Sequence, residues 1–452
     1  MAHRKPEFVV GPELRIEAFG EPLPAFEGET VAAALLAAGR TVFSRSVKYH
    51  RPRGPFCLAG RCANCLVRVD GVPNRFACLT AVAPGMQVEA QNVVGSASLD
   101  ALGAIDFLFP RGLDHHEMFA GVPVVEKAVA GVARHLAGLG KLPGAPAAAV
   151  APADVRTVDL AVVGAGPAGL SLARAAAEAG LSVELVDENA RPGGRLRCGM
   201  RRELEDWVEG CVAAIAKRGT VSLNTLALAA YRSAHGPFLA LRTTAPAERI
   251  SLLHAKYFAL CPGGSETLPI FTNNDLPGIF AARGLLKLCA THGVVPGEQV
   301  VVLAEHAEGL QVAEALQAAG ARVAAVVDPS GALSHATLPV IAGRIDRAAG
   351  RTHLTKVRVV GAGRPKTLSC DLLAISAPPA PSFELGRQLG LRAHFTANLG
   401  FTLAAAENGA TSLGHVFLAG EVNGPLSVEA CMAQGAAAAR ALVAQRPSEA
   451  IP

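Results

Sequence analysis

The chain has 452 residues, of which half are apolar and only 5% aromatic, and its formal net charge is +4. This length provides for two or three domains, and the abundant small residues suit α/β layers in which helices pack on sheets. A modest charge without a Lys/Arg run argues against nucleic acid as a partner.

The start of the chain is polar and lacks the apolar core of a signal peptide. No apolar run approaches the roughly 18 residues that a transmembrane helix needs. We therefore expect a cytoplasmic protein without a transmembrane segment, lying at the inner face of a membrane at most. In that reducing compartment the ten cysteines are better explained as metal ligands or thiols than as disulfides.

Residues 1–95 predict a ferredoxin-like β-grasp domain of short strands and one helix. We expect strands at 13–18 and 65–69 and a helix at 31–38, where small apolar residues line one face. Asp70-Gly71 predicts a hairpin turn, because both positions adopt positive φ at low cost. Residues 96–156 predict a connecting helical segment, with a helix near 124–139, and a linker rich in Pro and Ala.

From residue 157 onwards the pattern predicts two dinucleotide-binding folds. A strand, a glycine turn, a helix and a second strand are expected at 158–187, and a weaker unit of the same kind at 299–328. A strand at 416–419 and an Ala-rich helix at 427–444 follow. We therefore predict an FAD-binding domain at 157–271 and 377–452, with a degenerate NAD(P)-binding-like domain at 272–376 inserted in it. The overall fold class is α/β plus α+β.

Four cysteines of the first domain have the spacing of a cluster site. The pattern is Cys57-x4-Cys62-x2-Cys65-x12-Cys78, which is typical of plant-type [2Fe–2S] clusters, where two irons need four thiolates in two pairs. A zinc site also uses four cysteines, but it more often has paired knuckles, and only one C-x2-C occurs here. We predict that these four residues bind a [2Fe–2S] cluster.

A basic segment, Val47-Lys-Tyr-His-Arg-Pro-Arg-Gly, precedes the cysteines. It is either a solvated turn or a functional one, in which Arg51 and Arg53 offset the anionic cluster or meet a phosphate or a partner. The sequence does not decide between these interpretations.

The glycine turn in the first dinucleotide fold reads Gly164-Ala-Gly166-Pro-Ala-Gly169. Gly164 would make the tight turn, Gly166 would let the backbone approach a pyrophosphate, and Gly169 would let the helix pack on the strand. An acidic residue ends the second strand: Asp187, or Glu188 beside it, would bind the ribose hydroxyls. The alternative is a strand–helix–strand unit without a nucleotide.

Two later segments favour FAD over NAD at this site. Gly193-Gly194-Arg195 follows the acidic residue at a distance typical of FAD-binding proteins, and Gly420-Glu421 precedes the last helix. In flavoproteins with two dinucleotide folds, the second segment brings an acidic residue to the ribityl chain. The alternative for Glu421 is a carboxylate in a surface turn. The predicted cofactor-binding residues are Gly164, Gly166, Pro167, Ala168, Gly169, Asp187, Glu188, Gly194, Arg195, Gly420 and Glu421.

The second dinucleotide fold lacks two of the three motif glycines. Where GxGxxG is expected, the sequence has Ala304-Glu305-His306-Ala-Glu308-Gly309, whose carboxylates would repel a pyrophosphate. We therefore expect no NAD(P) there and interpret His306 as a loop residue. The other six cysteines form no C-x2-C, so no thioredoxin-type disulfide is expected, and Cys261 is best explained as a buried inert thiol.

These motifs together resemble a known family. Tyr49-His-Arg-Pro-Arg-Gly with the cysteine loop is similar to the ferredoxin-like module of hydrogen cyanide synthase and opine oxidase systems, and to a motif in the α subunit of heterotetrameric sarcosine oxidase. Thr272-Asn-Asn-Asp-Leu-Pro-Gly278 and the segments at Gly164 and Gly420 resemble the FAD subunits of the same systems. Since the sequence ends at Pro452, we expect neither the folate-type domain nor the extra cysteine cluster that some of these subunits contain.

The resemblance implies a composite subunit that carries FAD and a [2Fe–2S] cluster and relays electrons to a downstream acceptor. A partner similar to D-amino-acid oxidase, with its own flavin, would oxidise the C–N bond of an amino acid, imino acid or opine. This chain then needs no catalytic acid or base, and we name none. The alternatives are a self-contained NAD(P)H-dependent reductase, which the loop at 304–309 disfavours, and a scaffold subunit with vestigial cofactors.

Overall fold

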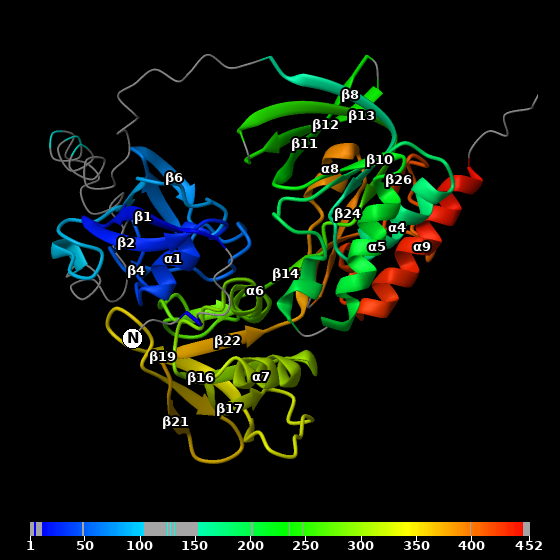
Figure 1. Cartoon of the computed structure of the whole chain (residues 1–452). Helices are drawn as coiled ribbons and strands as arrows, with labels where there is room; N and C mark the ends of the chain where they lie inside the picture. The colour runs from blue at the N-terminus through cyan, green and yellow to red at the C-terminus, as the bar shows by residue number, and fades with distance from the viewer. Residues whose placement is uncertain are drawn as a thin grey trace, which may run out of the picture. The chain divides into compact units, whose positions relative to one another are not determined.

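The computed structural model describes most of the chain and divides it into two compact units (Figure 1). The first comprises residues 1–146 and 268–377, and the second comprises 147–267 and 378–452. The residues described are 4–5, 11–47, 49–103, 124, 127, 131, 152–199, 202–234, 236–245, 247–397 and 399–445.

The amino-terminal part of the first unit is built on a five-stranded sheet of order β2-β1-β7-β5-β6. Its helix begins where Thr30 accepts a hydrogen bond from the Ala33 N–H, and all seven of its residues are buried. The hairpin turn has Asp70 at φ 48° and Gly71 at φ 78°, as predicted. The elements are β1 (Glu13–Ala18), β2 (Glu21–Phe26), α1 (Val31–Ala37), β3 (Ser44–Arg45), β4 (Pro52–Arg53), β5 (Leu66–Val69), β6 (Val72–Phe76), β7 (Gln87–Ala90) and η2 (Ala101–Gly103).

The inserted part of the first unit has a parallel sheet of order β15-β22-β16-β17-β18 and a three-stranded antiparallel sheet, β19-β20-β21. Apolar runs such as Val300–Leu303 form its buried strands, because helices cover such sheets and both faces must be apolar. The elements are β15 (Ile279–Ala281), α6 (Ala282–His292), β16 (Gln299–Ala304), α7 (Glu308–Ala318), β17 (Arg322–Asp328), β18 (Val340–Ala342), β19 (Arg344–Ala349), β20 (Lys356–Val360), β21 (Lys366–Ser369) and β22 (Leu372–Ser376).

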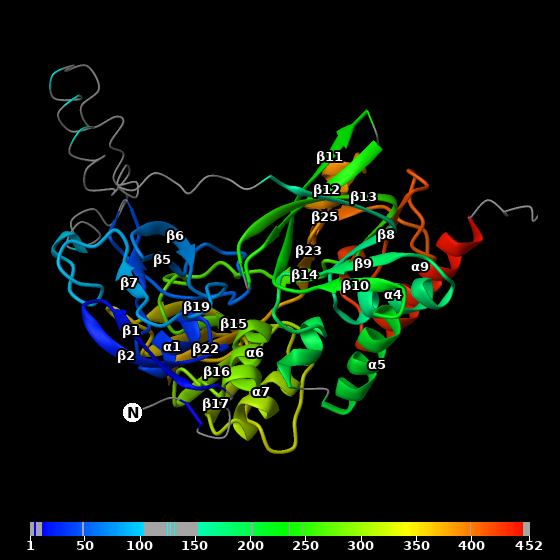
Figure 2. The same ribbon diagram turned by 45° about the horizontal axis from the view of Figure 1, so that its top comes forward.

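The second unit has a seven-stranded sheet in which β10, β9, β8, β13 and β26 run parallel and β13, β12 and β11 form an antiparallel meander. Helices α4, α5 and α9 lie together beside β8, β9 and β10 (Figure 2). The elements are β8 (Asp154–Val163), α4 (Pro167–Glu178), β9 (Val183–Val186), η3 (Gly194–Cys198), η4 (Arg202–Leu204), α5 (Glu205–Ile215), β10 (Gly219–Ser222), β11 (Thr225–Ser233), β12 (Gly236–Thr243), β13 (Arg249–Leu260), β14 (Gly264–Glu266), β23 (Pro379–Pro381), α8 (Glu384–Leu389), β24 (Ala393–Thr396), β25 (Gly400–Leu403), β26 (Val416–Leu418), η5 (Glu421–Asn423) and α9 (Val428–Ala444).

The predicted strands, helices and fold class are confirmed, with bounds that shift by a few residues at most, apart from a start of β8 four residues earlier than expected. The expected helix near 124–139 lies largely outside the described residues, although Val124, Lys127 and Gly131 are described and helical. The linker from 142 lies almost wholly outside them. The exact domain boundaries stay a prediction. The sequence did not predict that the amino-terminal and inserted parts form one compact unit.

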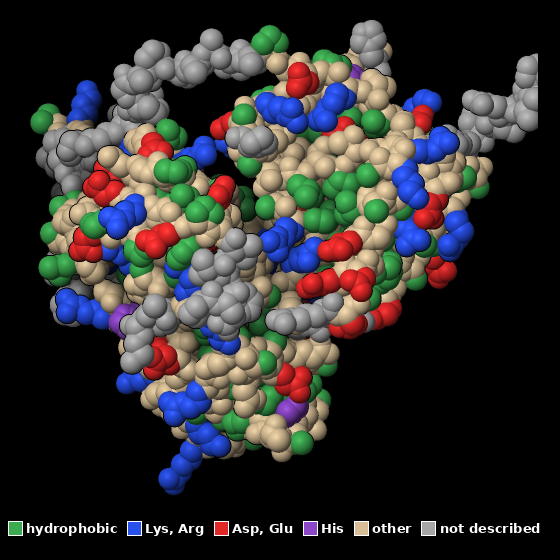
Figure 3. Space-filling view, viewed as in Figure 1, with side chains coloured by type: hydrophobic (Ala, Val, Ile, Leu, Met, Phe, Trp, Pro, Cys, Tyr) green, Lys and Arg blue, Asp and Glu red, His purple; other side chains and the backbone are tan. Residues whose placement is uncertain are grey.

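On the face shown in Figure 3, Lys and Arg side chains alternate with acidic ones and form no continuous basic stripe. Among the described residues, no helix is both long enough and apolar enough to span a bilayer.

Two helical glycines of the second unit allow a matched stability test. A Cβ on Gly435 in α9 would lie 2.2 Å from the Ala168 carbonyl oxygen in α4, whereas Gly210 in α5 has open space around it. We expect Gly210→Ala to raise the free energy of unfolding by about 1 kcal/mol, because Ala favours helix. Gly435→Ala should instead lower it by about 1–3 kcal/mol, because α9 must move away from α4.

The measurement is urea unfolding monitored by circular dichroism and Trp207 fluorescence. Equal stabilisation by both substitutions would contradict the close helix crossing.

Candidate functional site

The four predicted cluster cysteines lie together in two pairs on the loop between β4 and β5 and just after β6. The Sγ atoms of Cys65 and Cys78 are 3.4 Å apart, and Cys57 and Cys62 share a hydrogen bond. The described residues contain no group of three or more His, Cys, Asp or Glu placed around one metal ion. Two thiol pairs match the ligation of two irons, each with two protein sulfurs.

A hydrogen bond within each thiol pair shifts the pKa values of its two members in opposite directions. The hydrogen bond from Cys57 lowers the pKa of Cys62 to about 6, and the hydrogen bond with Cys78 likewise lowers the pKa of Cys65. The same hydrogen bonds, together with burial, raise the pKa of Cys57 and Cys78. One thiolate per pair is therefore easily formed, which suits residues that must become metal ligands.

Backbone N–H groups of the loop point at the sulfurs. Ala59 and Arg61 donate to the Sγ of Cys57 at 3.4 and 3.2 Å, and Gly60 donates to the Sγ of Cys78 at 3.3 Å. Such donors stabilise negative charge on cluster sulfurs and so raise the reduction potential. The curl that aims them requires positive φ at Leu58, an uncommon conformation for a residue with a side chain.

The predicted flavin residues lie at the carboxyl ends of parallel strands of one sheet. Gly164 follows β8, Asp187 follows β9 and Gly420 follows β26, and this edge of a parallel sheet is where nucleotides bind. A Cβ on Gly164 would lie 2.2 Å from the Cys261 carbonyl oxygen, and one on Gly169 would lie 1.8 Å from the Gly164 carbonyl oxygen. Glycine is thus required at both positions by the turn and by the packing of α4.

Gly166 differs from these two glycines, because no atom lies within 4 Å of the Cβ that it lacks. It is the N-cap of α4, and Pro167 and Ala168 open the helix behind it. Gly194, at φ 53°, lies against Gly166, since its missing Cβ would be 2.9 Å from the Gly166 Cα. The helix amino terminus therefore opens onto space that bare backbone borders, and this arrangement fits a dinucleotide pyrophosphate.

Asp187 is buried and holds the turn in place. Its Oδ2 accepts a hydrogen bond from the Ala165 N–H at 2.6 Å, and its Oδ1 accepts two from Asn189. Each carboxylate oxygen can accept about two hydrogen bonds, so Oδ2, which accepts one, keeps capacity for a ribose hydroxyl. Glu188 is half-buried beside it, and the geometry leaves both residues as candidates.

The second flavin segment joins the first through an ion pair. The Arg195 guanidinium lies 2.8 Å from Glu421 Oε1 and also donates to the Leu426 carbonyl at 2.6 Å. Glu421 is only 6% exposed, so it is not a carboxylate of a surface turn. Gly420, at φ 86°, donates its N–H to the Gln434 side chain and leaves room for Ala168.

Asn423 is a candidate that the sequence reasoning missed. Its side-chain nitrogen donates to Gln434 at 3.3 Å, but its Oδ1 is buried without a hydrogen-bond partner. A buried acceptor of this kind is costly unless a donor reaches it. Flavin and ribityl groups carry such donors, so this atom also fits a bound FAD. The only signal in the sequence was its place two residues after Glu421.

The corresponding edge of the inserted domain is filled by its own side chains. Arg283 pairs with both oxygens of Glu308 at 2.8 and 2.7 Å, at the start of α7. Asp328, at the end of β17, accepts from Ser330 and from the Leu333 N–H. Burial raises the pKa of Glu305, because a buried carboxylate loses its hydration. The groups that would hold a nucleotide are thus engaged with one another.

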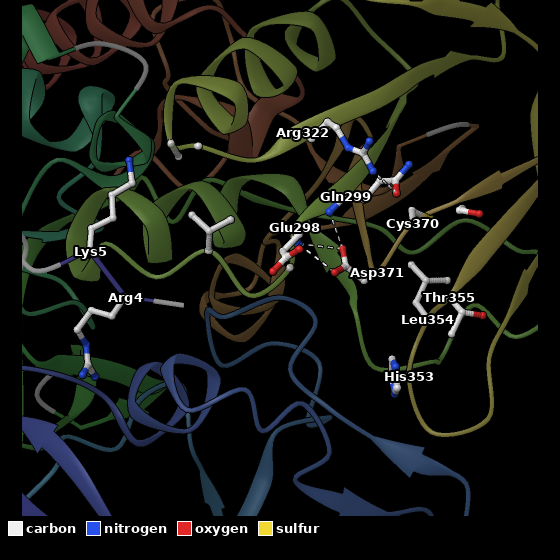
Figure 4. A pocket seen from close by; sticks show the side chains of 15 residues that line it. Arg4, Lys5, Glu298, Gln299, Arg322, His353, Leu354, Thr355, Cys370 and Asp371 are labelled. Atoms are coloured by element: carbon white, nitrogen blue, oxygen red, sulfur yellow. Dashed lines mark hydrogen bonds between the residues drawn. The ribbon is translucent and has the colours of Figure 1, made fainter. Parts of the chain in front are cut away.

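A hollow of about 810 Å3 lies in the first unit, at the opposite edge of the inserted sheet. Figure 4 shows Asp371 beside Glu298 and Gln299, whose N–H groups it accepts, while Arg322 donates to the Gln299 side chain. The hollow borders the amino ends of β16 and β17, contains none of the predicted site residues and lies away from the edge where nucleotides bind.

Comparison with known proteins places both redox modules. Residues 12–93 match the 2Fe-2S iron-sulfur cluster binding domain, and residues 162–219 match the NAD(P)-binding Rossmann-like domain. The sarcosine oxidase subunit alpha of Rhizobium meliloti is 30% identical over 94% of this chain and 45% of its own length. The hydrogen cyanide synthase subunit HcnA of Pseudomonas aeruginosa is 41% identical over 18% of this chain and 76% of its own length.

The chain belongs to the family of FAD and [2Fe–2S] α-type subunits. It spans about half the length of the sarcosine oxidase subunits that it matches. Among solved structures, L-proline dehydrogenase from P. horikoshii has the same fold, with a TM-score of 0.68 at 20% identity over 94% of this chain and 72% of that one. The predicted cofactors, FAD and a [2Fe–2S] cluster, are confirmed by the matched domains together with the family. The residues that bind them stay predictions.

Cysteine substitutions test the cluster site. Replacing Cys65 with Ala should abolish incorporation of iron and sulfide, because one iron would lose half of its protein ligands. Cys370→Ala is the control, since that buried thiol lies in the same unit but outside the loop. The measurement is metal analysis and electron paramagnetic resonance (EPR) of the reduced protein. Stoichiometric zinc in place of iron would contradict the assignment.

Gly166→Ala tests the pyrophosphate cradle. The added methyl group meets no protein atom, so the urea midpoint of the FAD-free protein should stay unchanged. The methyl group would occupy the space of the pyrophosphate, so the dissociation constant for FAD should rise at least about tenfold, or roughly 1.4 kcal/mol. Flavin absorbance after dialysis gives the result, with Gly210→Ala as control. Full retention of FAD would place the cofactor elsewhere.

Proposed function

We propose that this chain is the electron-transfer subunit of a heteromeric amine, imino-acid or opine dehydrogenase, an oxidoreductase acting on CH–NH or CH–NH2 donors. A partner flavoprotein similar to D-amino-acid oxidase would oxidise the substrate, and a downstream acceptor would take the electrons. The observation that carries the proposal is the presence of a two-iron cysteine site and an FAD-type cradle in one chain. The sarcosine oxidase relatives support the substrate class, since sarcosine is a secondary amine.

For the cluster, we propose that Cys57 and Cys62 bind one iron and that Cys65 and Cys78 bind the other. The pairing of the thiols supports this division. The N–H donors of the loop would then stabilise the added negative charge when the cluster is reduced.

For FAD, we propose that Gly164, Gly166 and Gly169, with Pro167 and Ala168 at the start of α4, cradle the pyrophosphate. Asp187 or Glu188 would bind the adenosine ribose. Gly194, Arg195, Gly420 and Glu421 would approach the flavin half, where the ion pair between Arg195 and Glu421 fixes both side chains. FAD exchanges electrons in pairs or singly and a [2Fe–2S] cluster exchanges one at a time, so together they link two-electron to one-electron chemistry.

The alternative function, a self-contained NAD(P)H-dependent reductase, has less support. In the inserted domain, the pair of Arg283 and Glu308 and the bonds of Asp328 occupy the edge where a nicotinamide cofactor would bind. The cytoplasmic location and the hetero-oligomeric state remain part of the proposal.

The test is anaerobic reduction of the purified full-length chain. NADH, NADPH and a panel of amino acids, sarcosine and opines should each leave the flavin absorbance unchanged, whereas dithionite should bleach it. Co-expression with an amino-acid-oxidase-like flavoprotein encoded beside it should give a complex in which one of these amines reduces the cluster, seen by EPR.

Two outcomes would contradict the proposal. Rapid flavin bleaching by NADH would revive the reductase alternative, and amine oxidation by the isolated chain would show that the substrate chemistry lies in this chain itself.

A further inference from the structure

The inserted domain contacts the cluster loop directly, and both belong to the same compact unit. The Ala281 N–H, at the end of β15, donates to the Phe56 carbonyl at 3.0 Å. Cys57 and Phe56 are buried in one apolar cluster with side chains from the inserted part of this unit, residues 268–377, namely Phe271, Leu276, Ile279 and Ala281. One iron ligand therefore owes its burial to residues more than 200 positions later in the chain.

Gly284 makes the closest of these contacts. It lies in the first turn of α6, and its missing Cβ would be 2.2 Å from the Cys57 carbonyl oxygen and 3.2 Å from the Leu58 Cβ. A side chain at Gly284 would require the backbone of a cluster ligand to move. That backbone has little freedom, because Leu58 has positive φ and the Cys57 Sγ accepts two N–H groups of the loop.

Polar contacts hold the segment that leads into the same loop. Asp275 lies 3.1 Å from the Arg51 guanidinium and 2.9 Å from that of Arg53, and Arg51 also donates to Asn273 Oδ1 at 2.8 Å. These side chains are largely buried, with 16% exposure for Asp275 and under 30% for the two arginines. Breaking a charge pair shielded in this way costs more than breaking an exposed pair, because the remaining charge is left buried without a partner.

The covering is one-sided. Cys57 lies beneath the inserted domain, but Arg61 and Ala63, at the turn of the loop, are exposed, and so is Leu79 beyond Cys78. The amino-terminal end of α6, which carries partial positive charge, contacts the Cys57 side. An anionic cluster would thus have a fixed, dry side and an open side.

We propose that the inserted domain positions the [2Fe–2S] cluster by holding the loop that carries its cysteine ligands. Its nucleotide edge is closed, and β15 and the first turn of α6 instead hold the ligand loop through Gly284, while Asp275 clamps Arg51 and Arg53. Gly284 and Asp275 are positioning residues: they act on the cluster through the loop. This inference rests on the proposed cluster site, and it assigns the degenerate domain a role that nucleotide binding no longer fills.

Two variants with matched controls test the proposal in the full-length chain. Gly284→Ala should displace the Cys57 backbone, which lowers the iron retained per chain and shifts the EPR g values and the midpoint potential of the remaining cluster. Gly363→Ala, in a turn of the same domain with open space around it, should match the wild type. FAD absorbance should be equal in all of them, because FAD is assigned to the second unit.

Asp275→Asn keeps the shape of the clamp but removes its charge. The cluster should assemble, but a ferrous chelator should remove its iron several-fold faster than from the wild type, because the loop separates from the inserted domain more often. Asp346→Asn is the control, since Asp346 pairs with the exposed Arg358 on the same domain.

The outcomes separate this inference from the proposed function. A wild-type chain that contains no iron defeats the proposed cluster site itself. If the wild type has a normal cluster, and the EPR signals, midpoint potential and chelation rates are unchanged in Gly284→Ala and Asp275→Asn, only the positioning role of the inserted domain is overturned. If Gly284→Ala fails to fold, the chelation rate of Asp275→Asn decides.

Discussion

Both candidate redox sites depend on glycines at which two backbone segments come closer together than any side chain would permit. Gly164 and Gly169 allow β8, α4 and the Cys261 carbonyl to meet, and that meeting creates the turn under the helix amino terminus. Gly284 allows α6 to meet the Cys57 carbonyl. In each case a side chain at the glycine would displace the backbone that we propose to lie against an anionic group, a pyrophosphate or an iron–sulfur cluster.

The inserted domain shows how a fold can lose one ligand and keep its architecture. Its sheet retains the parallel order of a dinucleotide fold, and Gly309 still packs on Ala304 as the third glycine of the motif would. The two glycines that admit a phosphate are replaced, and Arg283 neutralises Glu308 where a phosphate would lie. The domain that remains keeps its sheet and helices, and its surface packs against the cysteine loop.

Local patterns made most of the architecture predictable from the sequence. The cysteine spacing, the Asp70-Gly71 turn and the glycines after β8 each fall within one or two elements, so residue type and spacing suffice. The partner of Arg51 and Arg53 could not be found in this way, because Asp275 lies more than 200 residues away and no periodic signal joins them. The interpretations drawn from the sequence for this basic segment, a solvated turn or a phosphate site among them, did not anticipate an ion pair with Asp275. The pair of Arg195 and Glu421, 226 positions apart, escaped for the same reason.

The packing of the amino-terminal module on the inserted domain has a consequence for dissecting the molecule. A fragment that begins at β8 and lacks the amino-terminal module would still contain Phe271, Leu276 and Ile279. It would lack Phe56 and Cys57, which these side chains cover. Its inserted domain would present a fresh apolar surface to water, a feature that promotes aggregation. The amino-terminal module is therefore a separate stretch of sequence, but removing it would expose the apolar side chains of the inserted domain that it covers.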